Sequence, residues 1–297
     1  MKFTNIRTNN WENALRGMRN PKESYQKSDS RFGLGKWENV VDEATHVLEI
    51  YHYDKETNSS TYSDYDLNNF LKDVIIYEDR GYFEYAAIGP EDMRLAQTLI
   101  KAGSEHRKFM RQIFVSVDIT APLFWWKEMD TYKVATTANS TSTMHTIHKK
   151  EITLDSFETD DYHPELMLID DVPLGLRVDC FIDDLEQLRQ LYLMYNEKAK
   201  EFAATDKEKS EEYQKIAKMY WKELIRWTPE AWQQTRTWTG SYENLFGMCS
   251  PGQRRHHKIT QWSGCGEDFI SESFIKFARN LPYARHFIFI DENNALY

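Results

Sequence analysis

The sequence predicts an α+β fold, with a mixed or antiparallel sheet, flanking helices and a long helical hairpin. Short segments rich in β-branched and aromatic residues predict the strands, and two long stretches with helical periodicity predict the hairpin. No stretch rich in Gly, Ser or Pro divides the 297 residues. We therefore expect a single α+β domain, 1–297, with a helical excursion at about 184–226.

The N-terminal third contains two segments that are rich in Val, Ile, Tyr and Phe. These segments, Val40–Tyr53 and Val74–Ala87, predict strands because such residues fit a half-buried pleated surface. Glu91–Lys101 follows a proline and predicts an amphipathic helix. The polar stretch Lys55–Ser63 predicts a mobile surface loop, and we interpret Gly33-Leu34-Gly35 as a turn.

A half-buried strand is expected next, because apolar residues alternate with other residues from Ile113 to Ile119. Ala121-Pro122 ends this strand, since proline cannot donate to a ladder but suits the first turn of a helix. Leu123–Thr131 then predicts a short helix. Near the end of the chain, Phe287–Ile290 predicts one more strand.

The middle of the chain predicts two long helices. One apolar stripe runs from Leu185 to Phe202 and another from Tyr213 to Leu224. The charged connection Thr205–Glu211 favours an antiparallel hairpin. We expect the aromatic residues of these stripes to pack in a core or an oligomer interface and to hold Arg226 in place at the end of the second helix.

The most informative stretch is APLFWWKEMDTYKVATTANSTST, from Ala121 to Thr143. Its string of Thr, Ser and Asn packs a core poorly, because each buried hydroxyl or amide needs a hydrogen-bond partner or costs about 1–3 kcal/mol. We therefore interpret this string as the wall of a polar pocket.

Composition limits the classes of partner. The net charge of -10 and the pI near 5.5 argue against polymeric nucleic acid, whose binding depends on phosphates neutralised by Lys and Arg. No apolar run has the length of a membrane span and Met1–Thr4 does not open a signal peptide, so we expect a cytoplasmic protein without a membrane partner. Cys180, Cys249 and Cys265 are too few and scattered for a disulfide framework and are expected to be reduced.

A dense cationic cluster, Arg254–Lys258, follows the turn Pro251-Gly252. Two interpretations are open. The cluster is a binding site for a phosphate or carboxylate group, or it is a solvated basic helix end. Cys249, Cys265 and the two histidines of the cluster lack the spacing of a zinc site, so no metal is expected there. The acidic pair Asp170-Asp171 predicts a surface turn.

Two regions resemble a divergent flavin-dependent thymidylate synthase. In the first, the order of motifs matches: Gly103, Ser104-Glu105-His106, the strand to Ile119, Ala121-Pro122, and Thr131-Tyr132-Lys133 where the family has Arg-His-Arg. In the second, the matching residues are Arg226 before Pro229, the aromatic segment Thr237–Gly240, and Arg255 six residues before Gln261-Trp262. The resemblance covers about half of the chain.

The chain also departs from the family pattern. Thr136 and Thr141 stand where the family has serines, Asn139 where it has Glu, and Thr143 where it has its last Arg. Glu128 stands where the family usually has Gln. Because a pocket with these exchanges has a different charge pattern, its ligand need not be the family's usual pyrimidine nucleotide.

The resemblance implies a function and a set of site residues. In the family, reduced flavin and a folate carry a one-carbon unit to deoxyuridylate, which implies FAD as cofactor and NADPH and methylenetetrahydrofolate as possible co-substrates. By resemblance, flavin contacts fall to His106, Tyr132, Lys133 and Thr136, and substrate contacts to Glu128, Asn139, Thr141, Arg226 and Arg255. The resemblance also implies a homotetramer with sites shared between subunits. It assigns no catalytic residue.

Two alternatives remain open. One is a related flavin- or folate-dependent reaction on another nucleotide. The other is a catalytically silent protein that kept the scaffold.

Overall fold

The computed structural model describes residues 1–160, 162–250, 258–264, 272–292 and 296–297. The chain divides into two compact units. We call Met1–Lys2, Thr120–Thr131 and Asn139–Arg236 the hairpin unit, and Phe3–Ile119, Tyr132–Ala138 and Thr237–Tyr297 the main unit. That the whole chain forms one domain stays a prediction.

The first part of the chain alternates helices and short antiparallel strands. Its elements are β1 (Lys2–Asn9), α1 (Trp11–Arg19), β2 (Arg31–Gly35), α2 (Trp37–Tyr51), β3 (Tyr53–Asp54), β4 (Ser59–Ser60), α3 (Asp64–Val74), β5 (Ile75–Asp79), β6 (Tyr82–Ala87) and α4 (Pro90–Lys101). Strands β2, β6 and β5 form an antiparallel sheet in that order. The predicted helix Glu91–Lys101 is confirmed as α4, and the strand expected at Val74–Ala87 is present as the β5–β6 hairpin.

The prediction of a strand at Val40–Tyr53 was wrong, because this segment forms α2. Its buried residues are Val40, Ala44, Val47 and Leu48, which follow the helical period. Composition favoured a strand, but the spacing of the apolar residues decides for a helix that buries one face.

Gly33-Leu34-Gly35 is not a turn but part of β2. Gly33 pairs with Tyr85 across the sheet, and a Cβ atom at Gly33 would lie 2.7 Å from the Tyr85 hydroxyl oxygen. Glycine is therefore needed here because an aromatic ring of the neighbouring strand covers its backbone.

The segment Lys55–Ser63, expected to be a mobile loop, contains β4 and closes a two-stranded antiparallel hairpin with β3. Most of its side chains are exposed. The surface position is confirmed, and the mobility stays a prediction.

A four-stranded sheet has the order β1-β7-β11-β8, with β7 at Phe114–Pro122, β11 at Gln233–Ser241 and β8 at Thr137–Ser140. Strand β7 confirms the alternation predicted from Ile113 to Ile119, since Val115, Val117 and Ile119 are buried. The strand ends at Pro122 and α5 (Leu123–Met129) follows directly, as expected.

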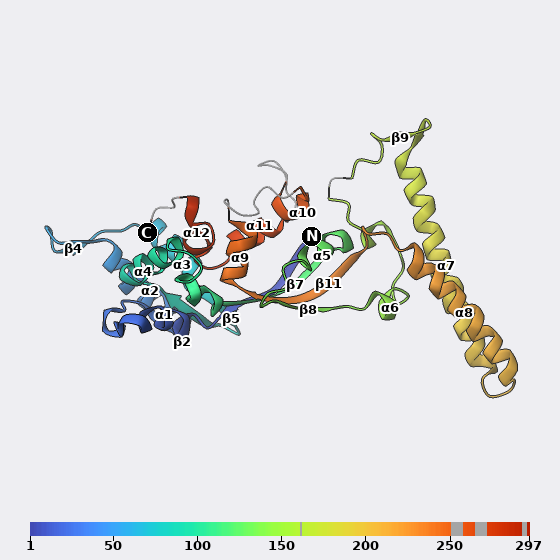
Figure 1. Cartoon of the computed structure of the whole chain (residues 1–297), viewed down its shortest axis with the longest axis horizontal. Coiled ribbons are helices and arrows are strands. Elements are labelled where there is room, and N and C mark those ends of the chain that lie inside the picture. The colour runs from blue at the N-terminus through green and yellow to red at the C-terminus, as the bar shows by residue number, and fades with distance from the viewer. Residues whose placement is uncertain (161, 251–257, 265–271, 293–295) are drawn as a thin grey trace. The chain divides into compact units, whose positions relative to one another are not determined.

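The helical hairpin is confirmed as α7 (Leu174–Phe202) and α8 (Lys207–Trp227), which run side by side in Figure 1. Tyr195 stacks on Tyr220 with ring centroids 5.6 Å apart. At the other end of the hairpin, Leu185 and Leu224 share a buried cluster with Ile152. Helix α7 begins at Leu174, before the predicted excursion, because the short hairpin of β9 (Leu168–Ile169) and β10 (Val172–Pro173) leads directly into it.

The main unit is completed by short helices: η3 (Arg107–Arg111), α9 (Tyr242–Cys249), α10 (Thr260–Ser263), α11 (Phe274–Arg279), α12 (Ala284–Phe287) and η5 (Ile290–Glu292). The strand predicted at Phe287–Ile290 was wrong, because helix α12 ends at Phe287 and Ile290 begins η5. All four residues from Phe287 to Ile290 are buried, and such a continuous apolar run does not distinguish a strand from a buried helix.

Three smaller predictions concern turns, thiols and the membrane. Asp170-Asp171 forms the predicted surface turn, with both residues at positive φ between β9 and β10. Cys180 and Cys249 are free thiols, as expected, while Cys265 lies outside the described residues. Over the parts of the chain that the structure describes, the search for a helix able to span a bilayer finds none.

Candidate functional site: a threonine-lined cavity

The hairpin unit contains a cavity of about 580 Å³, which we call the threonine cavity. Hydroxyl groups line much of it: Thr120, Thr141, Thr143, Thr146, Thr153, Ser156 and Thr235. Three lysines and two carboxylates also line it: Lys2, Lys149, Lys150, Glu151 and Asp155. Of the hydroxyl-rich string, Thr141 and Thr143 belong to this lining, while Thr137–Ser140 form the exposed strand β8.

Strands β7 and β11 place the first hydroxyl groups. The hydroxyl oxygens of Thr120 on β7 and Thr235 on β11 are 2.7 Å apart and share a hydrogen bond. The carbonyl oxygen of Thr235 accepts hydrogen bonds from the N–H and the hydroxyl of Thr141, at 2.9 Å and 3.1 Å. These bonds fix Thr141 against the beginning of β11.

Gln234 holds the next part of the wall. Its Nε2 donates to the Thr141 carbonyl oxygen at 2.8 Å and to the Thr143 hydroxyl at 3.2 Å. Arg236 Nε donates to the Gln234 Oε1 at 2.9 Å, which orients the amide. Because Gln234 is buried, its amide needs these partners, so the wall and the glutamine fix each other.

Two hydroxyl groups of the cavity keep a hydrogen to donate. Thr143 Oγ1 accepts from Gln234, and Ser156 Oγ accepts from the Thr153 N–H at 3.2 Å. Each hydroxyl carries one donor in addition to its acceptor lone pairs. These groups are therefore able to donate to the oxygens of a bound anion.

The charges around the cavity favour an anionic ligand. Lys2, Lys149 and Lys150 are exposed, and none of them has an ion-pair partner within the described residues. The carboxylates in the lining are Glu151 and Asp155. An ammonium group without a carboxylate partner is available to a phosphate or carboxylate of a ligand.

Glu186 of helix α7 supports the loop that carries Lys149 and Lys150. This carboxylate accepts from the Ile152 N–H at 2.8 Å and pairs with Arg189 at 2.6 Å, and Arg189 donates to the His148 carbonyl oxygen at 3.0 Å. Burial acts to raise the pKa of Glu186, but hydrogen bonds from Arg189, the Ile152 N–H and Gln190 outweigh it and hold the pKa below its usual value. The Glu186 carboxylate is thus charged at neutral pH. Together with Arg189 it holds His148 and Ile152, the residues on either side of the segment that carries Lys149 and Lys150.

Of the predicted substrate residues, Thr141 lines the threonine cavity. Asn139 is exposed on β8 and Glu128 is half-buried on α5. Arg226 is exposed at the end of α8, where it pairs with Glu223 of the same helix. The last three do not line this cavity, and Arg255 lies outside the described residues.

The predicted cofactor residues belong to the main unit. Tyr132 lies against Trp262, with ring centroids 5.4 Å apart, and the Thr136 hydroxyl donates to the Tyr132 carbonyl oxygen at 2.7 Å. Lys133 is exposed beside Tyr132, and His106 is exposed before η3. The structure brings Tyr132, Lys133 and Thr136 together, and the roles of all four residues stay predictions.

Sequence reasoning missed Lys2, Lys149, Lys150 and Thr235 as members of the site. The adjacent Lys149 and Lys150, which follow soon after the hydroxyl-rich string ends at Thr143, were a usable signal. Lys2 and Thr235 were not, because only the pairing of strands brings them to the cavity. The cationic cluster Arg254–Lys258 lies outside the described residues except for Lys258, which is exposed.

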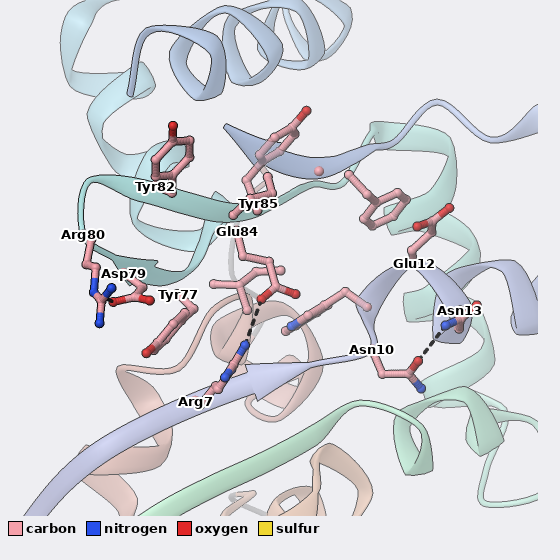
Figure 2. A pocket seen from close by; sticks show the side chains of 15 residues that line it. Arg7, Asn10, Glu12, Asn13, Tyr77, Asp79, Arg80, Tyr82, Glu84 and Tyr85 are labelled. Atoms are coloured by element: carbon pink, nitrogen blue, oxygen red, sulfur yellow. Dashed lines mark hydrogen bonds and ion pairs between the residues drawn. The ribbon is translucent and has the colours of Figure 1, made fainter. Parts of the chain in front are cut away.

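A second cavity, of about 670 Å³, lies in the main unit and is shown in Figure 2. Its charges are largely paired. Arg7 lies 3.6 Å from Glu84 and over the ring of Tyr77, and Arg80 lies 3.8 Å from Asp79. Three carboxylates, those of Glu12, Asp79 and Glu84, line this cavity against two arginines. It is therefore less suited to an anion than the threonine cavity, whose lysines outnumber its carboxylates.

Metal ligands do not gather near either cavity. A search for three or more His, Cys, Asp or Glu side chains able to hold a metal ion finds no such group in the described parts of the chain.

No protein-family model and no curated protein matches this chain. Among solved structures, the chain is similar to flavin-dependent thymidylate synthase ThyX from Helicobacter pylori complexed with FAD and dUMP, at 13% identity, covering 72% of this chain and 86% of that chain with a TM-score of 0.37. A second structure of ThyX from Helicobacter pylori with FAD and dUMP gives 13% identity, 68% and 83% coverage and a TM-score of 0.38.

Proposed function

We propose that the threonine cavity binds a nucleotide monophosphate and that the chain is a flavin-dependent thymidylate synthase-like enzyme, which transfers a one-carbon unit to deoxyuridylate. The binding step rests on a group of lysines that lie beside hydroxyl donors and have no ion-pair partner among the described residues. The cavity volume of about 580 Å³ lies within the range of small-molecule sites. The order of motifs in the sequence supports the choice of reaction.

The residues near Tyr132 fit a planar anionic cofactor. The Tyr132 ring is half-buried against the buried Trp262, and the exposed Lys133 has no ion-pair partner in the described parts of the chain. Tyr132 would contact the ring system and Lys133 the pyrophosphate of FAD. Reduced flavin would supply electrons for the reaction, with methylenetetrahydrofolate as one-carbon donor and NADPH as reductant.

The chain's own part in the reaction is binding and orientation. Lys149 and Lys150 would hold the phosphate of the nucleotide, while the Thr143 and Ser156 hydroxyls donate to its oxygens. Gln234 fixes Thr143 before the ligand arrives, so less ordering is required on binding.

A related reaction on another nucleotide is the second candidate. Thr143 lines the cavity where the family has an arginine, and it is already bonded to Gln234. This position therefore offers a neutral hydroxyl in place of a guanidinium group, which favours a ligand other than deoxyuridylate.

The test is calorimetric titration of the purified protein with deoxyuridylate, followed by assay of methyl transfer with NADPH and methylenetetrahydrofolate. The variant Lys149→Ala/Lys150→Ala should weaken binding by roughly tenfold or more, because charge-assisted hydrogen bonds are lost. The matched control is Lys215→Ala/Lys222→Ala, which removes two exposed lysines of α8. It should bind as the parent does.

Each outcome separates the hypotheses. Binding with methyl transfer supports the proposal, and binding of another nucleotide without methyl transfer to deoxyuridylate supports the second candidate. Equal affinity in the parent and in Lys149→Ala/Lys150→Ala would remove the threonine cavity from the site. A protein that binds neither flavin nor nucleotide would be the catalytically silent alternative.

A further inference from the structure

A third cavity, of about 540 Å³, lies in the main unit, and we call it the basic cavity. The charged side chains in its lining are Arg19, Lys22, Lys27, Arg94 and Glu91. We propose that the basic cavity binds a small phosphorylated molecule, at a site other than the threonine cavity.

A buried ion pair supports the cavity. Arg19 Nε lies 2.5 Å from Asp92 Oδ1, with side-chain exposures of 5% and 0%. The hydroxyls of Ser28 and Ser30 donate to the other oxygen of Asp92, at 2.5 Å and 2.6 Å. Asp92 is thus fully engaged below the surface and does not pair with the lysines of the cavity.

The same arginine fixes the loop that bears both lysines. Arg19 NH2 donates to the Lys27 carbonyl oxygen at 3.0 Å, and the Lys27 N–H donates to the Ser24 carbonyl oxygen at 3.1 Å. Lys22 ends a short 3-10 turn, Asn20–Lys22, that continues directly from α1. The cationic loop is therefore held in place without a ligand, which lowers the entropic cost of binding.

Two of the four basic side chains of the basic cavity lack a carboxylate partner among the described residues. Lys22 and Lys27 have no ion-pair partner in the portion of the chain that the structure describes. Arg94 pairs with Glu91 at 2.7 Å, but both side chains are more than half exposed. An exposed pair of this kind is weak, so a ligand anion can displace Glu91. In a chain with a net charge of -10, this cavity gathers four basic side chains and one carboxylate.

Size selects the class of ligand. A volume of about 540 Å³ suits a small molecule, whereas polymeric nucleic acid needs an extended basic surface. Arginine and lysine side chains that meet in a cavity are typical partners of phosphate groups.

The test measures binding of inorganic triphosphate by calorimetry in the Lys149→Ala/Lys150→Ala background, so that the threonine cavity does not contribute. In this background we expect binding. Adding Lys22→Gln/Lys27→Gln should weaken it about tenfold or more, because two charged donors are lost. Adding Lys215→Gln/Lys222→Gln changes the charge equally at exposed sites on α8 and should leave the affinity unchanged.

Three results would overturn the proposal: no binding in the background variant, full affinity after Lys22→Gln/Lys27→Gln, or an equal loss in the control on α8. Because Lys22 and Lys27 are exposed, their replacement should not impair folding, and an unchanged circular dichroism spectrum checks this. If triphosphate binds the parent but not the Lys149→Ala/Lys150→Ala background, the ligand occupies the threonine cavity. The proposed function would then stand while this inference fails.

Discussion

At the residue scale, single polar contacts set which donors each cavity offers to a ligand. Thr143 is the clearest case, because its hydroxyl accepts from a buried glutamine and still has a hydrogen to donate. The sequence identified Thr143 only as a departure from a family pattern. The structure shows it in the lining of the threonine cavity.

Replacing Thr143 tests this role directly. Thr143→Val keeps the shape of the side chain, removes the donor and leaves one Gln234 bond unmade. We expect the affinity for the nucleotide to fall about tenfold, the value of one hydrogen bond to a charged group. Thr205→Val, in the exposed connection between α7 and α8, is the control and should bind normally. Calorimetric titration of both variants decides the result, and a normal affinity of Thr143→Val would contradict the role.

The buried pair Arg19–Asp92 gives a prediction about stability. Arg19→Met leaves the Asp92 carboxylate buried without its cation and should lower the free energy of unfolding by about 3–5 kcal/mol. The double variant Arg19→Met/Asp92→Leu should regain part of this loss, since no buried charge remains. Urea denaturation of the parent and both variants measures the three values. A double variant that is less stable than Arg19→Met would contradict this explanation.

His286 predicts a pH dependence. Burial, and secondly the charge of Arg285, lower the pKa of His286 to about 3, and neither ring nitrogen has a hydrogen-bond partner among the residues that the structure describes. In the unfolded chain the His286 imidazole takes up a proton near pH 6.5. The contribution of His286 to the free energy of unfolding is therefore present above that pH and is lost as the pH falls toward 3. Between these two pH values, the free energy of unfolding changes by at most about 1.4 kcal/mol per pH unit through this group.

The measurement compares the parent with His286→Gln. Between pH 7 and pH 5, the parent should lose more free energy of unfolding than the variant does. Burial raises the pKa of Asp73 despite its bonds to Tyr297, Tyr283 and Arg285, and this acts in the opposite direction. Because Asp73 is present in both proteins, it largely cancels in the comparison. Parallel pH profiles would show that His286 has no such effect.

At the element scale, the helical hairpin shows how local signals and packing combine. Its periodicity predicted both helices, and the side-chain oxygen of Asp206 accepts from the Lys209 N–H at 3.0 Å to cap α8. Helix α2 shows the limit of composition, because its β-branched residues favoured a strand while their spacing makes one buried helical face. Spacing was the better guide in this case.

The cap of α8 can be tested by substitution. Asp206→Ala should lower the free energy of unfolding by about 0.5–2 kcal/mol, because the first turn of the helix loses an acceptor. Asp206→Asn keeps an acceptor and should cost much less. Urea denaturation followed by circular dichroism measures both. Equal losses in the two variants would show that charge rather than capping matters at this position.

At the scale of the whole molecule, the resemblance predicts a homotetramer with sites shared between subunits. Sedimentation velocity of the purified protein should give the mass of four chains. A monomer that still binds flavin and nucleotide would show that each chain forms a complete site by itself, and would argue against shared sites.

The sequence by itself determined the α+β class, β7, α4, α5 and the helical hairpin, because these depend on apolar periodicity along the chain. It also predicted a polar pocket at the hydroxyl-rich string, since so many hydroxyl groups need partners or solvent. Only the tertiary structure decided that Phe287–Ile290 is not a strand, since buried runs carry no periodicity. It also decided which residues line the cavity, because Lys2, Lys149 and Thr235 are distant in the sequence and meet only in the folded chain.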